Sequence, residues 1–389
     1  MNRYIRQFMK NVRKGDLILL ILCLTASTFG TLIISSTTNY TGSIRQPIVQ
    51  IAAAILGVFF FVIISSIDAE FFSEHRTALV IFNCFLLLLL IPFGTDNGTG
   101  NKSWLDIPLF PVDIQPAEIC KITFVLIMAS VMAANQNQIS KFKSIFQMGV
   151  QLALIVGMNL VLSDDMGVSL IFVFIFAGMA FSGGVSLLWF AVAAGAIVLL
   201  APIGWQMLGD YQKIRIQILY DPTIDPTGVG PRWHTRESLR SLTGGGMLGQ
   251  GLFNGRRTQQ GALNAQHTDY IFSAIGEELG FIGCFFVLLL LTLIVIRCIW
   301  VGTRSPDYMR RMVCFGCASA LIFQITSNVG MCVGMTPVIG LTLPFISYGG
   351  SSLLSLYAMM GLVSGVYARP TATSHERYIR PPLSTYARH

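Results

Sequence analysis

Four clusters of polar residues in this sequence lie beside long apolar runs, where an ionisable side chain is costly and is therefore a functional candidate. One cluster is HTDYIFSAIGEELGFIG, where four ionisable residues stand at the start of a predicted helix: His267, Asp269, Glu277 and Glu278. A carboxylate at such a place can act as a general base. The glycine-rich run GGGMLGQG before it is typical of a mobile loop or a close backbone approach, and phosphate cradling there stays an open alternative.

A second cluster is QPAEICK, residues 115–121. Its proline occupies the preferred first turn of a predicted helix. Glu118 and Lys121 then lie three residues apart on one helical face and can form an ion pair. We favour a structural pair at the start of this helix over a direct catalytic role. Trp104, shortly before the cluster, is typical of an aromatic anchor at a membrane interface.

The remaining two clusters each separate two apolar runs. Asp164 and Asp165 are adjacent carboxylates that could bind a metal ion or cap the helix that follows, and capping is the more common outcome. The run NVGMCVGMTPVIGLTLPFISYGGSS holds prolines and glycines that exclude one unbroken helix. Irregular backbone at membrane depth is tolerated only where it lines protein or a cavity. Ser351 or Ser352 could cap a helix whose positive end faces such a cavity.

The rest of the chain must position these groups in a membrane. A soluble domain carries roughly 25% charged residues, whereas this chain carries 12% and is 53% hydrophobic. About 20 apolar residues span the hydrocarbon core of a bilayer. The segments that approach this length are 17–36, 48–67, 76–93, 117–134, 145–162, 167–182, 185–205, 274–300, 311–332 and 343–367. The sequence therefore predicts an all-α integral membrane protein, a polytopic bundle of about ten transmembrane helices with a long extracytoplasmic loop.

Basic residues predict how this bundle is oriented. The N-terminal segment 1–16 is basic, and the positive-inside rule assigns it to the cytoplasm. An even number of helices in the membrane domain, residues 17–368, puts the tail 369–389 on the same side, where its composition indicates disorder. The long loop 206–273 would then lie outside the membrane.

The basic character of this loop favours an anionic ligand, with attraction to anionic lipid headgroups as the alternative. Lys213 and Arg215 belong to its segment YQKIRIQIL, whose alternation suits a strand, although a short interfacial helix is also compatible. The net charge of +7 does not by itself indicate nucleic-acid binding, because basic residues at helix ends set membrane orientation. We expect no nucleic-acid partner.

In their order along the chain these segments resemble the SEDS family of bacterial envelope proteins (shape, elongation, division and sporulation), whose members include RodA, FtsW and SpoVE. The resemblance runs from about residue 15 to residue 368. It rests on QPAEICK, on DMG at 165–167, on YQKIRI, on GGGMLGQG, on HTDYIFSAIGEELGFIG, and on the run from N-x-G-M to PFISYGGSS. Any one of these motifs is weak, but all of them in this order are specific.

The resemblance implies a peptidoglycan glycosyltransferase that polymerises lipid II, a disaccharide-pentapeptide on undecaprenyl pyrophosphate, at the outer face of the bacterial cytoplasmic membrane. It puts the family's catalytic acid on Asp269 and implies a class B penicillin-binding transpeptidase as partner, besides membrane lipids. A divalent cation, Mg²⁺ or Mn²⁺, bound at Asp269 is an open option. The candidate substrate-binding residues are Lys121, Glu118, Trp104, Asp165, His267, Lys213, Arg215, Ser347, Gly349 and Ser351.

The sequence departs from the family pattern at several positions. Ser103 stands where an arginine is common, and Asn264 and Ala265 stand where proline and glutamate are usual. Pro231 and Arg232 replace a tyrosine and a glutamine. Asp269 is retained, so these changes bear on substrate binding and not on activity itself.

Two other functions would use similar residues. A lipid II flippase also needs polar groups inside a helical bundle, but it should carry matched groups on both sides of the membrane. A scaffold that only recruits the transpeptidase could lose Asp269 without harm. The concentration of motifs at the predicted outer face favours polymerisation there.

Overall fold

The computed structural model describes residues 15–68, 71, 74–95, 102–106, 114–207, 209–221, 224–225 and 232–369. The segment 1–14, the tail from 370 onward and Pro231 lie outside the described residues, so the predicted cytoplasmic start and disordered tail fall there. The long helices are α2 (Leu17–Thr38), α3 (Arg45–Ser66), α5 (Arg76–Leu88), α7 (Pro116–Ala134), α8 (Phe142–Ser163), α9 (Met166–Ser182), α10 (Leu187–Met207), α13 (Ile271–Arg304), α14 (Tyr308–Cys332) and α15 (Gly350–Ala368). The shorter elements are α6 (Leu90–Phe93), β1 (Gly94–Thr95), β2 (Trp104–Leu105), α11 (Asp210–Tyr220), α12 (Trp233–Gly244) and the 3-10 turns Asn39–Thr41, Gln136–Gln138 and Thr258–Gln260.

Within the described part of the chain, nine helical segments are long and apolar enough to span a membrane, and α9 is a shorter apolar helix. These segments coincide with the predicted spans, so the prediction of about ten transmembrane helices is confirmed. The protein is a multi-pass membrane protein. The antiparallel pair of β1 and β2 is a short hairpin between α6 and α7.

The last predicted span, 343–367, was wrong at its start, because α15 begins only at Gly350. The residues before it, 333–349, form an irregular stretch that we call the unwound segment. Pro344 cannot donate a helical hydrogen bond, and Phe345 has a φ of 63°, which a right-handed helix cannot contain. The sequence's own prolines and glycines had excluded an unbroken helix here, and that inference is confirmed.

Two further segments differ in detail from the expectation. The predicted span 76–93 divides into α5 and α6 at Leu89, in the turn before Pro92, which has no N–H to continue the ladder. The segment YQKIRIQIL is helical and forms most of α11, although its alternation suits a strand. The Gln212 side chain accepts a hydrogen bond from the Gly209 N–H at 3.2 Å and so stabilises the start of this helix.

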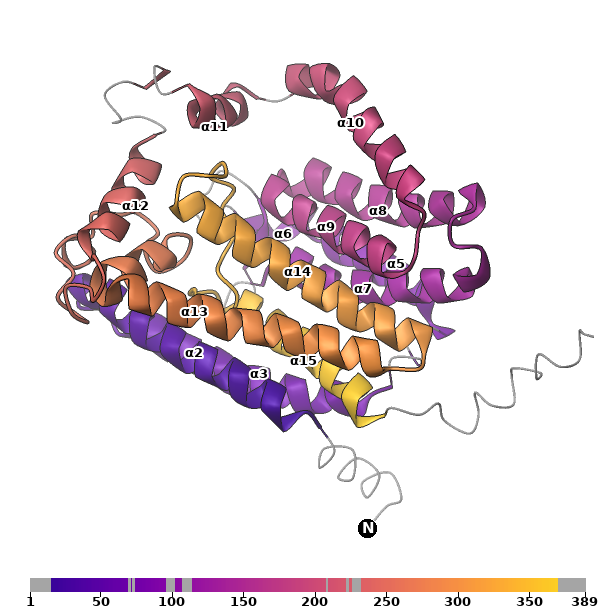
Figure 1. Ribbon diagram of the computed structural model, residues 1–389, viewed down its shortest axis with the longest axis horizontal. Coiled ribbons are helices and arrows are strands. Elements are labelled where there is room, and N and C mark those ends of the chain that lie inside the picture. The colour runs from indigo at the N-terminus through magenta and orange to yellow at the C-terminus, as the bar shows by residue number, and fades with distance from the viewer. Residues whose placement is uncertain are drawn as a thin grey trace, which may run out of the picture.

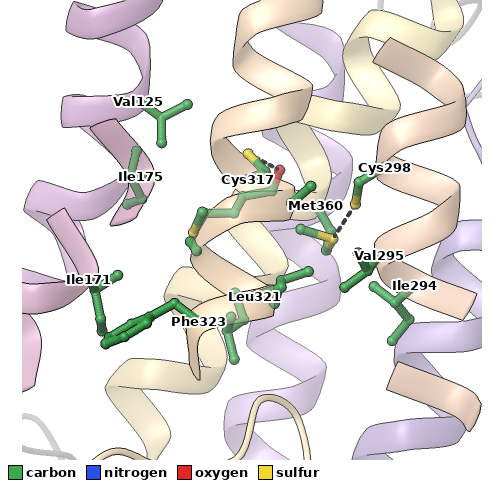
Figure 2. Packing of buried hydrophobic residues seen from close by; sticks show 14 of the residues in the cluster. Val125, Ile171, Ile175, Ile294, Val295, Cys298, Cys317, Leu321, Phe323 and Met360 are labelled. Atoms are coloured by element: carbon green, nitrogen blue, oxygen red, sulfur yellow. Dashed lines mark hydrogen bonds between the residues drawn. The ribbon is translucent and has the colours of Figure 1, made fainter. Parts of the chain in front are cut away.

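The core is centred on α14, which lies between α13 on one side and α7 and α9 on the other (Figure 1). Figure 2 shows Leu321 and Phe323 of α14 among apolar side chains from these neighbours. Met360 of α15 reaches the same layer, with its sulfur 3.6 Å from that of Cys298. Packing of this kind, rather than an apolar driving force, holds helices together in lipid.

In contrast to α14, helix α10 stands away from the bundle and leads to α11 (Figure 1). The apolar window of α10 has no buried residue, although its composition suits a membrane span. The helix contacts the bundle through its first turn, where Trp189 Nε1 donates to the carbonyl of Ser140 at 2.8 Å. The two helices together form an arm that ends above the unwound segment.

The unwound segment also packs against α2 with little space to spare. A Cβ at Gly30 would lie 2.5 Å from the backbone oxygen of Ile346 and 2.7 Å from its Cα. No flexible side chain could yield there, because the neighbouring atoms are backbone. Gly30 therefore sets how closely the unwound segment approaches the bundle.

We predict that Gly30→Ala destabilises the purified protein by about 1–3 kcal/mol, the usual cost of overpacking a tight contact. Thermal unfolding in detergent would measure this as a lower midpoint. The matched control is Gly157→Ala on α8, where an added Cβ meets nothing within 4 Å. The control should keep or raise the midpoint, because alanine favours a helix more than glycine does. Equal midpoints for Gly30→Ala and wild type would contradict the close contact.

Candidate functional site

Asp269 lies two residues before α13, in a stretch that rests on the unwound segment. The backbone N–H of Tyr348 donates to the carbonyl of His267 at 2.9 Å, and Ser347 Oγ donates to the carbonyl of Thr268 at 2.6 Å. The rings of His267 and Tyr348 lie 5.6 Å apart. Burial lowers the pKa of His267 below its usual range and favours the neutral imidazole. Two of the predicted residues, His267 and Ser347, thus flank Asp269.

The Asp269 carboxylate is partly buried and lies against backbone. A methyl group at Gly340 would be 3.7 Å from its Oδ2. Desolvation raises the pKa of Asp269 to about 6, a rise that the positive charge of Arg215 opposes and the negative charge of Asp165 reinforces. The N-cap of α13 is Tyr270, so the Asp269 side chain is not the cap of that helix.

Arg215 connects α11 to this site. Its Nη1 donates to the carbonyl of Val338 in the unwound segment at 2.8 Å. Its charge also lowers the pKa of His234 on α12, in addition to the larger effect of burial, and the His234 ring stacks on that of Tyr270 at 5.8 Å. Lys213, two residues before Arg215, lies instead 3.9 Å from the exposed Asp210 of its own helix. The structure therefore brings Arg215 to the site and leaves Lys213 on the arm.

Asp165 approaches the site from the start of α9. One carboxylate oxygen accepts from the Val168 N–H at 3.0 Å, so the predicted helix cap is confirmed. The other oxygen accepts from Gln115 Nε2 at 3.2 Å. Burial raises the pKa of Asp165 above its usual value, and the charge of Glu118 adds to this effect. The preceding Asp164 ends α8 in a left-handed conformation, with a φ of 51°.

Glu118 and Lys121 form the predicted ion pair, with Lys121 Nζ 2.8 Å from Glu118 Oε2. Both side chains are buried, at 5% and 0% exposure. Ser355 of α15 donates to the same carboxylate, and Ser351 Oγ accepts from the backbone N–H of Gln115 at 3.2 Å. These bonds join the first turns of α7 and α15. The positive charge of Lys121 is neutralised by Glu118 of the same helix.

Trp104 lies in β2, apart from these pairs. Its carbonyl accepts from Thr95 Oγ1 at 3.1 Å, and the next residue, Leu105, bridges Ile114 just before α7. Ser103, where the family pattern has arginine, donates to the carbonyl of Ser163 at 3.3 Å and ties the hairpin to the end of α8. The hairpin thus borders the site without entering the charged network.

The glycine-rich run packs onto the first half of α13 and is not an anion cradle. The N–H groups of Gln250 and Gly251 donate to the carbonyls of Glu277 and Glu278, each at 2.9 Å. A Cβ at Gly249 would lie 2.1 Å from the Glu278 carbonyl oxygen, so glycine is required by the close approach. Of the two alternatives in the sequence, the close backbone approach is confirmed.

Glu277 and Glu278 stabilise the same loop through their carboxylates. Glu277 accepts from the backbone N–H groups of Arg257 at 2.7 Å and Thr258 at 3.1 Å. Glu278 accepts from Ser36 Oγ of α2 at 2.7 Å. These acids are buried, and their bonds to the protein give them a structural role.

Sequence reasoning missed two buried amides that hold the unwound segment. Gln50 of α3 donates to the carbonyl of Ser347 at 3.1 Å and accepts from the N–H of Gly349 at 3.3 Å. Asn328 of α14 donates to the carbonyls of Asp269 at 2.8 Å and Leu341 at 2.7 Å. An amide side chain within an apolar run could have identified both residues as candidates. Their partners could not be found in this way, because the bonded carbonyls lie 13 to 297 residues away in the sequence.

A divalent cation would find a limited set of ligands. In the described residues no group of three histidine, cysteine or acidic side chains could hold a metal ion. Asp165 and Asp269 are carboxylates whose charges act on one another, and the charge of Glu118 also acts on Asp165. Mg²⁺ is commonly bound by one or two carboxylates together with substrate phosphates, so this pair fits such an ion but not an all-protein cage.

A groove of about 480 Å³ lies near Asp165. It is formed by the junction between α8 and α9 together with the end of α10 and the start of α11. It is lined by Leu160, Asp164, Met166, Ala201, Gly204, Trp205 and Gln212. The lining is mostly apolar, and its polar side chains include Asp164 at the end of α8 and Gln212 of α11. Such a groove suits an amphiphile.

Comparison with known proteins gives a consistent result over almost the whole chain. The family model of FtsW, RodA and SpoVE, described as cell cycle protein, matches residues 16–371. The chain is 31% identical over 356 residues to the peptidoglycan glycosyltransferase MrdB of Escherichia coli, covering 90% of this chain and 93% of that protein. It is 30% identical over 358 residues to the stage V sporulation protein E of Bacillus subtilis, covering 90% and 96%.

Solved structures share the fold. A chain from a peptidoglycan synthase complex, described by its coordination of polymerization and crosslinking, matches with a TM-score of 0.78 at 26% identity, covering 91% of this chain and 97% of that one. A mutant of the Rod shape determining protein RodA of Thermus thermophilus matches with a TM-score of 0.67 at 25% identity, with the same coverage.

The electrostatics of Asp269 predict opposite effects from two neutral substitutions. Arg215→Gln should raise the pKa of Asp269 above about 6, because the opposing positive charge is lost, while Asp165→Asn should lower it. Asparagine still caps a helix, so the second variant should fold. Infrared difference spectra of the protonated carboxyl band, assigned by its loss in Asp269→Asn, would follow the titration. Shifts in the same direction would refute this arrangement of charges.

Proposed function

The chain belongs to the family of FtsW, RodA and SpoVE cell cycle proteins, and from that premise we propose how it acts as a peptidoglycan glycosyltransferase. We propose that it polymerises lipid II into glycan strands with Asp269 as the general base. The observation that carries this proposal is the Asp269 carboxylate itself, which is desolvated beside the charge of Arg215 and is not used to cap α13.

The proposed step joins a sugar hydroxyl of one substrate molecule to the anomeric carbon of another. Asp269 takes the hydroxyl proton, the oxygen forms the new glycosidic bond, and the bond from the anomeric carbon to the pyrophosphate breaks with its electron pair on the phosphate oxygen. A pKa of about 6 is close to neutral pH, where a carboxylate base is most effective. Pyrophosphate departs without protonation, so the second carboxylic acid of a glycosidase is not required.

Arg215 is the residue that we propose to stabilise the departing pyrophosphate. A preformed positive charge is most useful where negative charge develops in the transition state. Lys121 is also buried near the site, but Glu118 neutralises it at 2.8 Å. We therefore assign Glu118 and Lys121 to holding the first turn of α7, which contacts Asp165 through Gln115.

The remaining candidate residues divide into two groups. The polar atoms of Ser347, Gly349 and Ser351 are engaged by the protein, which supports a role in positioning rather than in binding sugar. His267 and Trp104 border Asp269 and the α7 start respectively, and we propose that they contact the saccharide. The nearby groove, apolar along α8 and α10, would take the polyprenyl chain.

A divalent cation, Mg²⁺ or Mn²⁺, would be held by Asp269 and Asp165 with phosphate oxygens of the substrate. When bound, it would supply positive charge against the pyrophosphate. The protein's own residues would still orient the acceptor and take its proton.

Polymerisation at one face accounts for the distribution of charge better than transport does. At the opposite end of the bundle, Asp16 is tied to Arg297 by two hydrogen bonds of 2.8 and 3.0 Å. Arg310 lies buried 3.3 Å from Asp68 at the same end. These charges are paired with one another, which supports a structural role at that end, whereas Asp269 has no ion-pair partner among the described residues.

The direction of the bundle follows from the same proposal. We propose that the end with Asp269 faces outward from the bacterial cytoplasmic membrane and that both termini are cytoplasmic, as the charge asymmetry of the loops favours. The similar chain from a peptidoglycan synthase complex, in which polymerization and crosslinking are coordinated, supports a class B penicillin-binding transpeptidase as partner.

The catalytic assignment is tested by Asp269→Asn, which keeps the size of the side chain and removes its charge. We predict that lipid II polymerisation by the purified protein falls by about 10²–10⁴-fold, the range that a general base contributes. The control is Asp210→Asn on the exposed side of α11, where the carboxyl is 99% exposed and activity should persist. Long glycan strands from Asp269→Asn at close to the normal rate would exclude Asp269 as the base.

The orientation is tested with single cysteines at two exposed positions, Asn264→Cys near Asp269 and Asn137→Cys between α7 and α8. The background should carry Cys84→Ser, because the other native thiols are buried. In intact cells an impermeant thiol reagent should label only the cysteine at 264. Labelling at both positions, or at 137 alone, would overturn the proposed topology.

A further inference from the structure

Asn328 occupies the point where α14, the Asp269 stretch and the unwound segment meet. Its side chain is fully buried. The two N–H groups of its amide reach two separate stretches of chain, the carbonyl of Asp269 at 2.8 Å and that of Leu341 at 2.7 Å. One side chain thus satisfies two backbone acceptors that belong to no regular element.

The direction of the amide is fixed by these partners. With nitrogen and oxygen exchanged, the side-chain oxygen would face two carbonyl oxygens, so only the donor orientation is compatible with the contacts. Asn328 Oδ1 is buried, and among the described residues it has no hydrogen-bond partner. An unsatisfied buried acceptor is costly, which indicates that the two donated bonds are what this position requires.

Both bonds act on the geometry around the Asp269 carboxylate. The bond to the Asp269 carbonyl holds its peptide group and therefore the direction in which its side chain leaves the backbone. The bond to Leu341 holds the neighbouring Gly340, whose φ is +67° and where an added Cβ would lie 3.7 Å from Asp269 Oδ2. The Asn328 amide therefore fixes both the backbone of Asp269 and the backbone next to Gly340.

We propose that Asn328 is a positioning residue that holds the Asp269 carboxylate in its reactive direction and keeps the Gly340 backbone against it. This inference rests on the proposed function, because it assumes Asp269 as the base. Asn328 touches no reacting atom and acts only through Asp269 and the unwound segment. It accounts for a buried amide near the C-terminal end of an apolar helix, where a polar group is otherwise costly.

The substitution that tests this is Asn328→Leu, which removes both donors at similar volume. In lipid II polymerisation we expect kcat to fall roughly 10–100-fold, since small misplacements of a catalytic group have effects of this size, while KM changes little. The matched control is Gln324→Leu, one turn earlier on α14, where the amide is also buried and where, among the described residues, Oε1 has no hydrogen-bond partner. The control should retain kcat.

A second readout separates positioning from general damage. Binding of lipid II to each purified variant should keep the wild-type stoichiometry, because Asn328 touches no reacting atom and Arg215 stays in place. A lower kcat at full binding then reports the direction of the Asp269 carboxylate and not a loss of folded protein.

The outcomes are distinct. Should Asn328→Leu not yield folded protein, Asn328→Ser keeps one donor and should show an intermediate loss of kcat at full lipid II binding. A normal kcat in either variant, a change in KM alone, or an equal loss of kcat in Gln324→Leu would overturn the proposal. Failure of the proposed function would be seen separately, as an active Asp269→Asn or an inactive wild type.

Discussion

The peptide groups of the unwound segment are the constraint on which this site depends. Backbone that leaves the helix at the end of a membrane bundle has donors and acceptors that lipid cannot satisfy, so neighbouring side chains must do so. Gln50, Asn328 and Arg215 supply these bonds from three different helices. Because each of them belongs to a helix, these bonds hold the irregular segment in one position. Asp269 is held with it, because the Asp269 stretch is bonded to the same segment.

Hydroxyl groups connect the two charged parts of the site. Ser347, Ser351 and Ser355 are spaced four residues apart, and they bond in turn to the Asp269 stretch, to the start of α7 and to Glu118. Ser347 of the unwound segment thus holds the Asp269 stretch, and Ser351 and Ser355 of α15 hold the start of α7 with its Glu118–Lys121 pair.

Hydrogen bonds from buried side chains also stabilise the first half of α13. Glu277 and Glu278 are buried, and their carboxylates accept bonds from the loop around Thr258 and from α2. The glycines before them allow the loop to reach these acceptors. Glu277 and Glu278, which the sequence grouped with Asp269, therefore hold the loop and α2 against the start of α13.

The sequence by itself determined the membrane character, the number and place of the spanning helices, the Glu118–Lys121 pair and the Asp165 cap, because each depends on local length, hydropathy or spacing along one helix. It also singled out Asp269 through the motif around it. Tertiary structure alone decided that α11 is a helix carrying Arg215 to the site, that α15 begins late, and that Asn328 and Gln50 hold the unwound segment. Gln50 and Ser347 are 297 residues apart, and no periodicity along the chain encodes which buried donor meets which distant carbonyl.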